Sequence, residues 1–289
     1  MRVTNQMMAN QMTAQLFRQV TQMVKTQEQI NSGKRINRPS DDPADMSSVL
    51  SYRTTISNIE QYSDTISKTK LNINTVDDLL AMVGDLLIDA KEIAYDTSPT
   101  MRSELAEDVA SIRDQILQMA NYQIDGQYIF SGESSDTAPY NSTTWNYNGD
   151  DGTRDALIGE NMQIHLTADG TSIFGADSDN VFNILNDLET ALTSPASPTD
   201  IEAQISRLDT ANDRVTTIRA KNASVYQRLE ATEKHYDYFK VNVQELLSNT
   251  EDADVAAAII NYKVQQTTYE STLATSSMII KKSLIDFLQ

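Results

Sequence analysis

The chain of 289 residues contains no cysteine and only two histidines. Without cysteine it can form no disulfide, no thiolate metal site and no thiol nucleophile. Neither His165 nor His235 belongs to a recognisable nucleophile motif, and the chain has no Walker loop, no GxGxxG segment and no HExxH segment. The sequence therefore predicts a protein that is not an enzyme and that needs no cofactor.

Basic residues are also scarce, because 23 Lys and Arg stand against 41 Asp and Glu, for a formal net charge of -18. Such a surface repels phosphate backbones and anionic lipid headgroups. No apolar stretch is long enough to span a membrane, and the N-terminus lacks the apolar core of a cleaved secretory signal. We expect a soluble chain that binds neither nucleic acid nor membrane.

Glycine is rare except in the middle of the chain, where residues 126–175 hold seven of the 9 glycines and the only tryptophan. Three short segments there, at 128–130, 163–167 and 172–174, follow strand patterns. We predict that 126–180 is a small β-rich module. It is too short for a large core, so we expect it to pack on helices or on neighbouring subunits.

Both flanks of this module keep apolar residues at helical spacing. The predicted fold is mainly α, a long-helix coiled-coil rod formed by the N- and C-terminal segments with the β-rich module inserted. We predict an N-terminal coiled-coil segment at 1–40, a helical rod at 41–125 and 181–250, and a C-terminal coiled-coil helix at 251–289. Residues 40–43 (Ser-Asp-Asp-Pro) are expected to start a helix, and residues 249–252 to cap the last one.

The two ends of the chain carry heptad patterns, in which apolar positions alternate steps of four and three residues. Polar residues within them weaken an isolated pair but fix its register. An ordinary intramolecular core would give similar stripes. We interpret these seams as helices that pair with each other and are completed by other subunits. The C-terminal seam is Val255, Ile259, Tyr262, Gln266, Tyr269, Leu273, Ser276, Ile280, Ser283 and Phe287, and the N-terminal seam is Val3, Met7, Asn10, Ala14, Phe17, Thr21 and Val24.

A basic loop, residues 31–39, lies between the first two predicted helices of this acidic protein. Its Lys34, Arg35 and Arg38 could bind phosphate, but we expect them to meet carboxylates of a neighbouring subunit. We therefore add these three cations to the apolar seam residues as the predicted assembly interface.

One acidic cluster could in principle hold a hard cation such as Ca²⁺. Gly152 is misplaced for a calcium-binding helix-loop-helix, and no glutamate follows at the required step. We interpret the cluster as a solvated turn and predict no metal site. The cluster consists of Asn146, Asn148, Asp150, Asp151 and Asp155.

Residues 30–44 read INSGKRINRPSDDPA, which resembles the N-terminal signature of flagellins and flagellin-like junction proteins. Residues 228–230 (RLE) and 252–269 resemble elements of the C-terminal half of that family. Three segments resemble its hook–filament junction members more than flagellin itself. These are residues 38–43 (RPSDDP), 126–132 (GQYIFSG) and 283–288 (SLIDFL).

The resemblance implies a structural component of the bacterial flagellum, an adaptor that joins the hook-side junction to the filament, with flagellin as the alternative. It implies an extracellular location at the hook–filament junction, after type III export without a cleaved signal peptide, with the segment 1–40 as export signal. The implied partners are copies of itself, the hook-side junction protein, flagellin and, before secretion, a cytoplasmic export chaperone. An uncovered apolar stripe would need such a chaperone.

Overall fold

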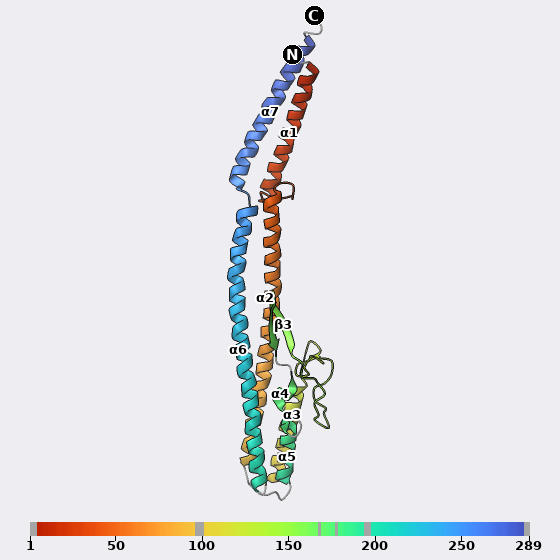
Figure 1. Cartoon of the computed structure of the whole chain (residues 1–289), viewed down its shortest axis with the longest axis vertical. Helices are drawn as coiled ribbons and strands as arrows, with labels where there is room; N and C mark the ends of the chain where they lie inside the picture. The colour runs from red at the N-terminus through yellow and green to blue at the C-terminus, as the bar shows by residue number, and fades with distance from the viewer. Residues whose placement is uncertain (1–4, 96–100, 167–168, 177–178, 194–197, 286–289) are drawn as a thin grey trace. The chain divides into compact units, whose positions relative to one another are not determined.

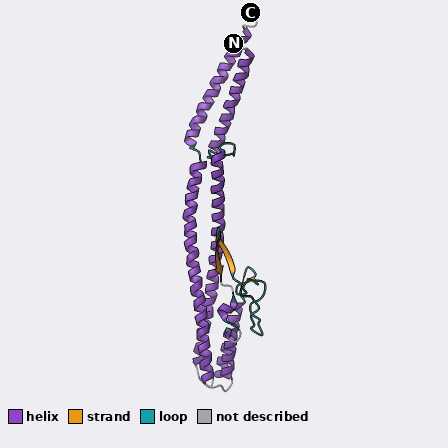
Figure 2. Ribbon diagram, viewed as in Figure 1, coloured by secondary structure: helices purple, strands orange, loops and turns teal. Residues whose placement is uncertain are grey.

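A computed structural model of the chain describes residues 5–95, 101–166, 169–176, 179–193 and 198–285 (Figure 1). The described chain is mainly helical, with long helices at both ends and a small strand-containing segment in the middle (Figure 2), which confirms the predicted fold class. None of the described helices combines the length and apolar character needed to cross a membrane.

The helices are α1 (Asn5–Ser32), α2 (Pro43–Tyr95), α3 (Arg102–Ala120), α4 (Gly170–Phe174), α5 (Val181–Thr193), α6 (Pro198–Glu251) and α7 (Val255–Ile285). The strands are β1 (Gln123–Ile124), β2 (Gln127–Tyr128), β3 (Arg154–Gly159) and β4 (Met162–Leu166). They form two antiparallel hairpins, β1–β2 and β3–β4.

Local capping chemistry sets where the long helices start. Helix α2 begins at Pro43, and Asp42 Oδ1 accepts a hydrogen bond of 3.2 Å from the Asp45 backbone N–H, so the start expected at residues 40–43 is confirmed. The cap predicted for the last helix at residues 249–252 is wrong. Residues 249–251 continue α6, and Asp254 caps α7 instead by accepting 2.9 Å from Ala257 N–H. Residues 252–254 lie outside both helices, and Asp254 directly precedes α7, where its carboxylate can accept from the first N–H groups of that helix.

The chain forms two compact units. The first unit consists of Met1–Asn58 and Tyr238–Gln289, and it contains α1 and α7, which lie side by side. The second unit is Ile59–Asp237. Each of the long helices α2 and α6 contributes a segment to both units.

The core of the second unit is built from α2, α3, α5 and α6, with α3 and α5 in direct contact. Ion pairs join α2 to α6 on the outside of this core: Arg219 binds both carboxylate oxygens of Asp77 at 3.0 and 3.2 Å, and Lys70 binds Glu233 at 2.7 Å. The fully buried side chains of these helices include Leu80, Val83, Val109, Ile116, Phe182 and Leu185.

The β3–β4 hairpin packs on the helices and has no core of its own. Alternate residues of its strands face inward, and the cross-strand neighbours Ala156 and Ile164 join Ile158 in a second hydrophobic cluster with side chains of α2 and α6. The Tyr236 hydroxyl of α6 donates a hydrogen bond of 2.8 Å to the Ile158 carbonyl. The predicted strand at 163–167 is therefore present as β4, although Thr167 lies outside the described residues.

The strand predicted at 172–174 is wrong, because these residues belong to the short helix α4. Asp169 caps that helix by accepting hydrogen bonds from the backbone N–H groups of Thr171 at 2.8 Å and Ser172 at 3.2 Å. Of the strand predicted at 128–130, only Tyr128 lies in β2. Burial explains both differences, since Phe174 and Phe130 pack edge to face within an aromatic cluster rather than alternate along a strand.

The segment GQYIFSG offers a matched pair of glycine substitutions, because Gly126 and Gly132 both have positive φ, +79° and +70°. A Cβ at Gly126 would meet nothing within 4 Å, whereas one at Gly132 would come within 2.0 Å of Asp150 Oδ1 and 2.4 Å of its carbonyl oxygen. We expect Gly126→Ala to lower the free energy of unfolding by about 1–2 kcal/mol, from the left-handed backbone alone.

For Gly132→Ala we expect about 1–3 kcal/mol of overpacking in addition to the backbone cost. Chemical denaturation of the two variants, followed by circular dichroism, measures the difference. Equal losses of stability at the two positions would contradict the packing of Gly132 against Asp150.

Candidate assembly interface

Helices α1 and α7 meet along one face of each helix. On both helices the covered positions are spaced by alternating steps of four and three residues, as in a coiled coil. On α7 these buried or half-buried residues are Ala258, Tyr262, Gln265, Tyr269, Thr272 and Ser276, and on α1 they are Met12, Leu16, Gln19, Met23, Thr26 and Ile30.

This contact face is unusually polar for a helix pair. Gln19 Nε2 donates a hydrogen bond of 3.3 Å to Thr272 Oγ1, while the buried Oε1 atoms of Gln19 and Gln265 have no hydrogen-bond partner among the described residues. Thr26 and Ser276 donate their hydroxyl hydrogens back to carbonyls of their own helices, at 3.0 and 2.7 Å. Unpaired buried amide oxygens are unfavourable, so this face stabilises the pair less than an apolar seam would.

The N-terminal seam that the sequence predicted is not the face of α1 that meets α7. Met7, Ala14, Phe17 and Val24 are exposed, and the Phe17 side chain keeps 69% of its accessible surface. Helix α1 carries two stripes at heptad spacing, and periodicity alone does not tell which one faces the partner helix. The predicted residue Val3 lies outside the described residues.

The C-terminal seam divides between the two faces of α7. Tyr262 and Tyr269 lie on the covered face, whereas Val255, Ile259 and Leu273 are exposed. Ile280 belongs to α7, and Phe287 lies outside the described residues. Of the predicted C-terminal residues, the two tyrosines thus lie at the contact with α1, whereas Val255, Ile259 and Leu273 lie at the surface.

The first unit therefore presents apolar side chains that its own fold does not cover. Three of these exposed apolar residues are not among the predicted seam residues. They are Val20 on α1, and Ile260 and Val264 on α7, and Ile260 is 64% exposed. Ile260 and Val264 are four residues apart and therefore lie on the same side of α7. The predicted heptad pattern runs through the adjacent Ile259 and so omits both residues. We call the exposed apolar residues of α1 and α7 the outer face of the helix pair. It consists of Met7, Phe17, Val20, Val24, Val255, Ile259, Ile260, Val264 and Leu273.

The cations of the basic loop have carboxylate partners within the chain. Lys34 binds Glu251 at 2.9 Å, Arg35 binds Asp42 and Asp45, and Arg38 binds Glu28 at 3.1 Å. Hydrogen bonding to Asp45 is the main cause that raises the pKa of Arg35. Contact of these cations with a neighbouring subunit stays a prediction, and any such contact would compete with these pairs.

Glu251, the last residue of α6, is the centre of this network, with a side chain only 3% exposed. Its carboxylate binds both Lys34 and Arg53 of α2. The backbone reinforces the contact, since Arg35 N–H donates 2.6 Å to the Glu251 carbonyl and Ala253 N–H donates 2.9 Å to the Gly33 carbonyl. We call these contacts the Glu251 clasp, which holds the basic loop against the break between α6 and α7.

Asp41 orders the second half of the loop. Its Oδ2 accepts backbone hydrogen bonds from Asn37 at 3.2 Å and Arg38 at 3.0 Å, and Lys25 binds its Oδ1 at 3.0 Å. The bond from Lys25 is the main cause that lowers the pKa of Asp41. A carboxylate with a lowered pKa stabilises the folded state at neutral pH, and this contribution is lost as pH falls through the folded pKa.

Side chains of the acidic cluster in the middle segment make hydrogen bonds within that segment. Asp150 accepts hydrogen bonds from Glu133 N–H at 2.7 Å, Ser134 Oγ at 2.6 Å and Gly152 N–H at 3.0 Å, and the Ser134 bond is the main cause that lowers its pKa. Asp155 pairs instead with His165 across the β3–β4 hairpin. In the part of the chain that the structure describes, no group of three His, Asp or Glu side chains is arranged to hold a metal ion.

Comparison with known proteins gives matches at both ends of the chain. Residues 3–135 match the model of the bacterial flagellin N-terminal helical region, and residues 205–288 match that of the C-terminal helical region. Flagellar hook-associated protein 3 of Salmonella typhimurium is 25% identical, over 95% of this chain and 96% of its own length. Flagellin FlaB1 of Treponema pallidum is 24% identical over 88% of this chain and 87% of its own.

A similar fold is known from crystallography. The flagellar junction protein of Legionella pneumophila superimposes with a TM-score of 0.59 at 14% identity, over 72% of this chain and all of that one. At this identity the likeness concerns the fold alone.

The Glu251 clasp can be tested with two glutamate-to-glutamine substitutions. We expect Glu251→Gln to weaken the clasp by about 1–3 kcal/mol, since a buried carboxylate that binds two cations is replaced by a neutral amide. Hydrogen exchange of the backbone amides of Arg35 and Ala253 should then become faster, by about tenfold for each 1.4 kcal/mol lost.

The matched control is Glu28→Gln, which removes a surface ion pair with Arg38 and should cost about 0–1 kcal/mol. Equal exchange rates at Arg35 and Ala253 in both variants would show that Glu251 does not hold the loop.

Proposed function

The chain belongs to the bacterial flagellin family, and from this membership we propose that it is a junction protein of the hook-associated protein 3 type, a structural adaptor between the hook side of the flagellum and its filament. The match to hook-associated protein 3 runs over nearly the full length of both chains and includes the middle segment. The match to FlaB1 covers a smaller share of each chain. The junction-type segments at 38–43, 126–132 and 283–288 favour the same choice.

The observation that carries the proposal is the two-faced helix pair at the ends of the chain. One face of α1 and α7 makes a polar intramolecular contact, and the outer face exposes large apolar side chains such as Phe17 and Ile260. Exposed apolar surface of this kind marks an interaction site. In the proposed adaptor, neighbouring subunits cover the outer face, and the protein's role is mechanical rather than catalytic.

The proposed partners are copies of this chain, the hook-side junction protein and flagellin, with a cytoplasmic export chaperone before secretion. The proposed location is extracellular, at the hook–filament junction, reached by type III export without a cleaved signal peptide. We retain the division into terminal coiled-coil segments at 1–40 and 251–289, helical segments at 41–125 and 181–250, and a middle module at 126–180 as part of this proposal. Nucleic acid and membrane remain outside the proposed partners, as the net charge of -18 suggests.

The alternative within the family is a filament subunit. Immunogold labelling of intact flagella with antibodies against this chain separates the two roles. We expect label only at the boundary between hook and filament, because an adaptor is needed only there. Label along the whole filament would establish the flagellin alternative and contradict the proposal.

Deletion of the gene tests the adaptor role directly. Cells should assemble hooks but retain no filament, and flagellin should accumulate in the medium. Normal attached filaments in the deletion strain would refute the proposed function.

Complementation of that strain tests the outer face. We expect Phe17→Glu to abolish filament attachment, since it places a charge in the apolar contact, while the free energy of unfolding of the isolated chain changes by less than about 0.5 kcal/mol at this exposed site. The matched control, Gln22→Glu, adds the same charge at an exposed polar position of α1 and should restore attachment. Normal motility with Phe17→Glu would exclude this face as the interface.

A further inference from the structure

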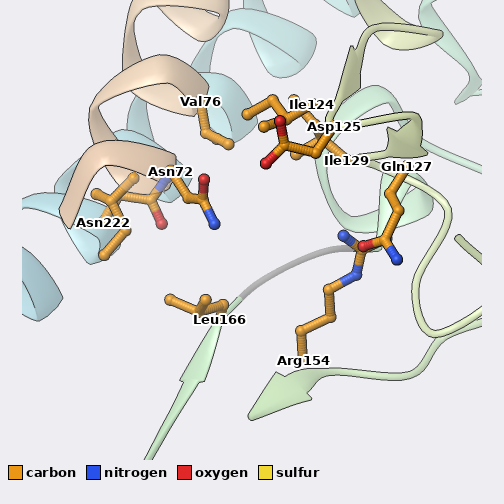
Figure 3. A pocket seen from close by; sticks show the side chains of 10 residues that line it. Asn72, Val76, Ile124, Asp125, Gln127, Ile129, Arg154, Leu166 and Asn222 are labelled. Atoms are coloured by element: carbon orange, nitrogen blue, oxygen red, sulfur yellow. The ribbon is translucent and has the colours of Figure 1, made fainter. Parts of the chain in front are cut away.

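The second unit contains a cavity that the proposed function does not explain (Figure 3). It has a volume of about 130 Å³ and lies among α2, α6, the β1–β2 hairpin and the outer ends of β3 and β4. Its apolar lining consists of Ile73, Val76, Ile124, Ile129 and Leu166.

One end of the cavity is lined by amides without partners. The Asn222 side chain lines the cavity, is 8% exposed and has no hydrogen-bond partner among the described residues. The Asn72 amide lies beside it, and the Asp125 carboxylate points in their direction (Figure 3). The amide atoms of Asn222 are accessible from the cavity, so Asn222 is a group that a ligand could bind through hydrogen bonds.

The opposite side of the cavity offers donors. Arg154 is held in place by its Nε, which donates 3.0 Å to the Gly132 carbonyl, and by Nη2, which donates to the Tyr128 carbonyl. Its Nη1 has no hydrogen-bond partner in the described chain. Gln127 is drawn on the same side as Arg154 (Figure 3).

We propose that this cavity binds an extended peptide segment of a neighbouring flagellar subunit, which inserts one aliphatic side chain. The peptide N–H faces the oxygens of Asp125, Asn72 and Asn222, and the peptide C=O faces Arg154. This arrangement matches donors to acceptors at both ends, while the inserted side chain covers Ile73 and Val76. The identity of the neighbour as a flagellar subunit rests on the proposed function, whereas the peptide chemistry of the cavity does not.

The volume favours a single side chain over a metabolite. Small-molecule pockets usually enclose roughly 300–1,000 Å³. A cavity of about 150 Å³ accepts one benzene ring. The cavity of this chain is therefore the size of one leucine or isoleucine side chain, and its polar ends suit the peptide groups on either side of that residue.

Because the chain lacks cysteine, a single introduced thiol reports on the cavity. The reporter is Gln127→Cys at the cavity rim, and its matched control is Gln123→Cys, an exposed glutamine of the same hairpin that does not line the cavity. The measurement is the rate of maleimide labelling of the full chain, with and without N-acetyl-L-leucine methylamide as peptide probe and with free leucine as the alternative ligand.

We expect the peptide probe to slow labelling of Gln127→Cys and to leave Gln123→Cys unchanged. At nine-tenths occupancy the rate falls about tenfold, since only the open fraction reacts. No slowing, equal slowing at both positions, or stronger slowing by free leucine would overturn the proposal.

Asn222→Leu, added to the reporter, separates binding from folding. We expect it to abolish the protection without lowering the melting temperature, because it replaces an unpaired amide by an apolar group of similar size. A lower melting temperature would assign Asn222 a structural role instead and contradict the proposal. The exposed Asn72→Leu gives the same test at a position that tolerates substitution.

The reporter in isolated hook–filament complexes identifies the partner. We expect Gln127→Cys to be labelled about tenfold more slowly there than in the free chain, with Gln123→Cys slowed less. Labelling at the free-chain rate would show that no neighbouring subunit occupies the cavity. Absence of the chain from such complexes would refute the proposed function and the subunit assignment, while the result with the peptide probe would still decide the chemistry of the cavity.

Discussion

The two ends of this chain depend on one buried carboxylate. Glu251 ends α6, and its binding of Lys34 and Arg53 fixes the basic loop next to the break that precedes α7. A buried carboxylate is tolerated only when it is paired and hydrogen-bonded, and removal of its partners is costly. The same contact joins the loop that follows α1 to the segment that precedes α7, and α1 and α7 lie side by side from this point. The Glu251 clasp thus links the basic loop, residues 31–39, to the pair formed by α1 and α7.

In the proposed adaptor, the weak contact between α1 and α7 leaves both helices dependent on neighbouring chains. Gln19 and Gln265 leave buried oxygens without partners, so the intramolecular contact keeps α1 and α7 together without making them independent of other chains. Large apolar side chains such as Phe17 and Ile260 lie on the outer face. Burial of that surface in an assembly would stabilise the helices further. In the proposed adaptor, neighbouring subunits would cover this surface.

The predictions from the sequence that the structure contradicts have a common physical cause. The segment 172–174 has the alternation of a strand, yet Asp169 offers its carboxylate to the following N–H groups and turns it into α4. Residues 249–252 have the composition of a helix cap, yet residues 249–251 continue α6, and Asp254 caps α7. In both cases the aspartate directly before the helix set where the helix begins. The cavity beside Asn222 gave no sequence signal, because its residues come from α2, α6 and both hairpins.

The sequence by itself determined the mainly helical fold, the position of the middle module, the start of α2 and the flagellin-like family, because each of these rests on local periodicity, capping chemistry or a long ungapped motif. It also predicted assembly residues on both terminal helices, but it did not distinguish the face of each helix that meets the other helix. Only the tertiary structure decided that Tyr262 and Tyr269 face α1 while Phe17 faces away from α7. A helix with two apolar stripes can turn either stripe toward its partner, and only the packing of α1 against α7 shows which stripe is covered.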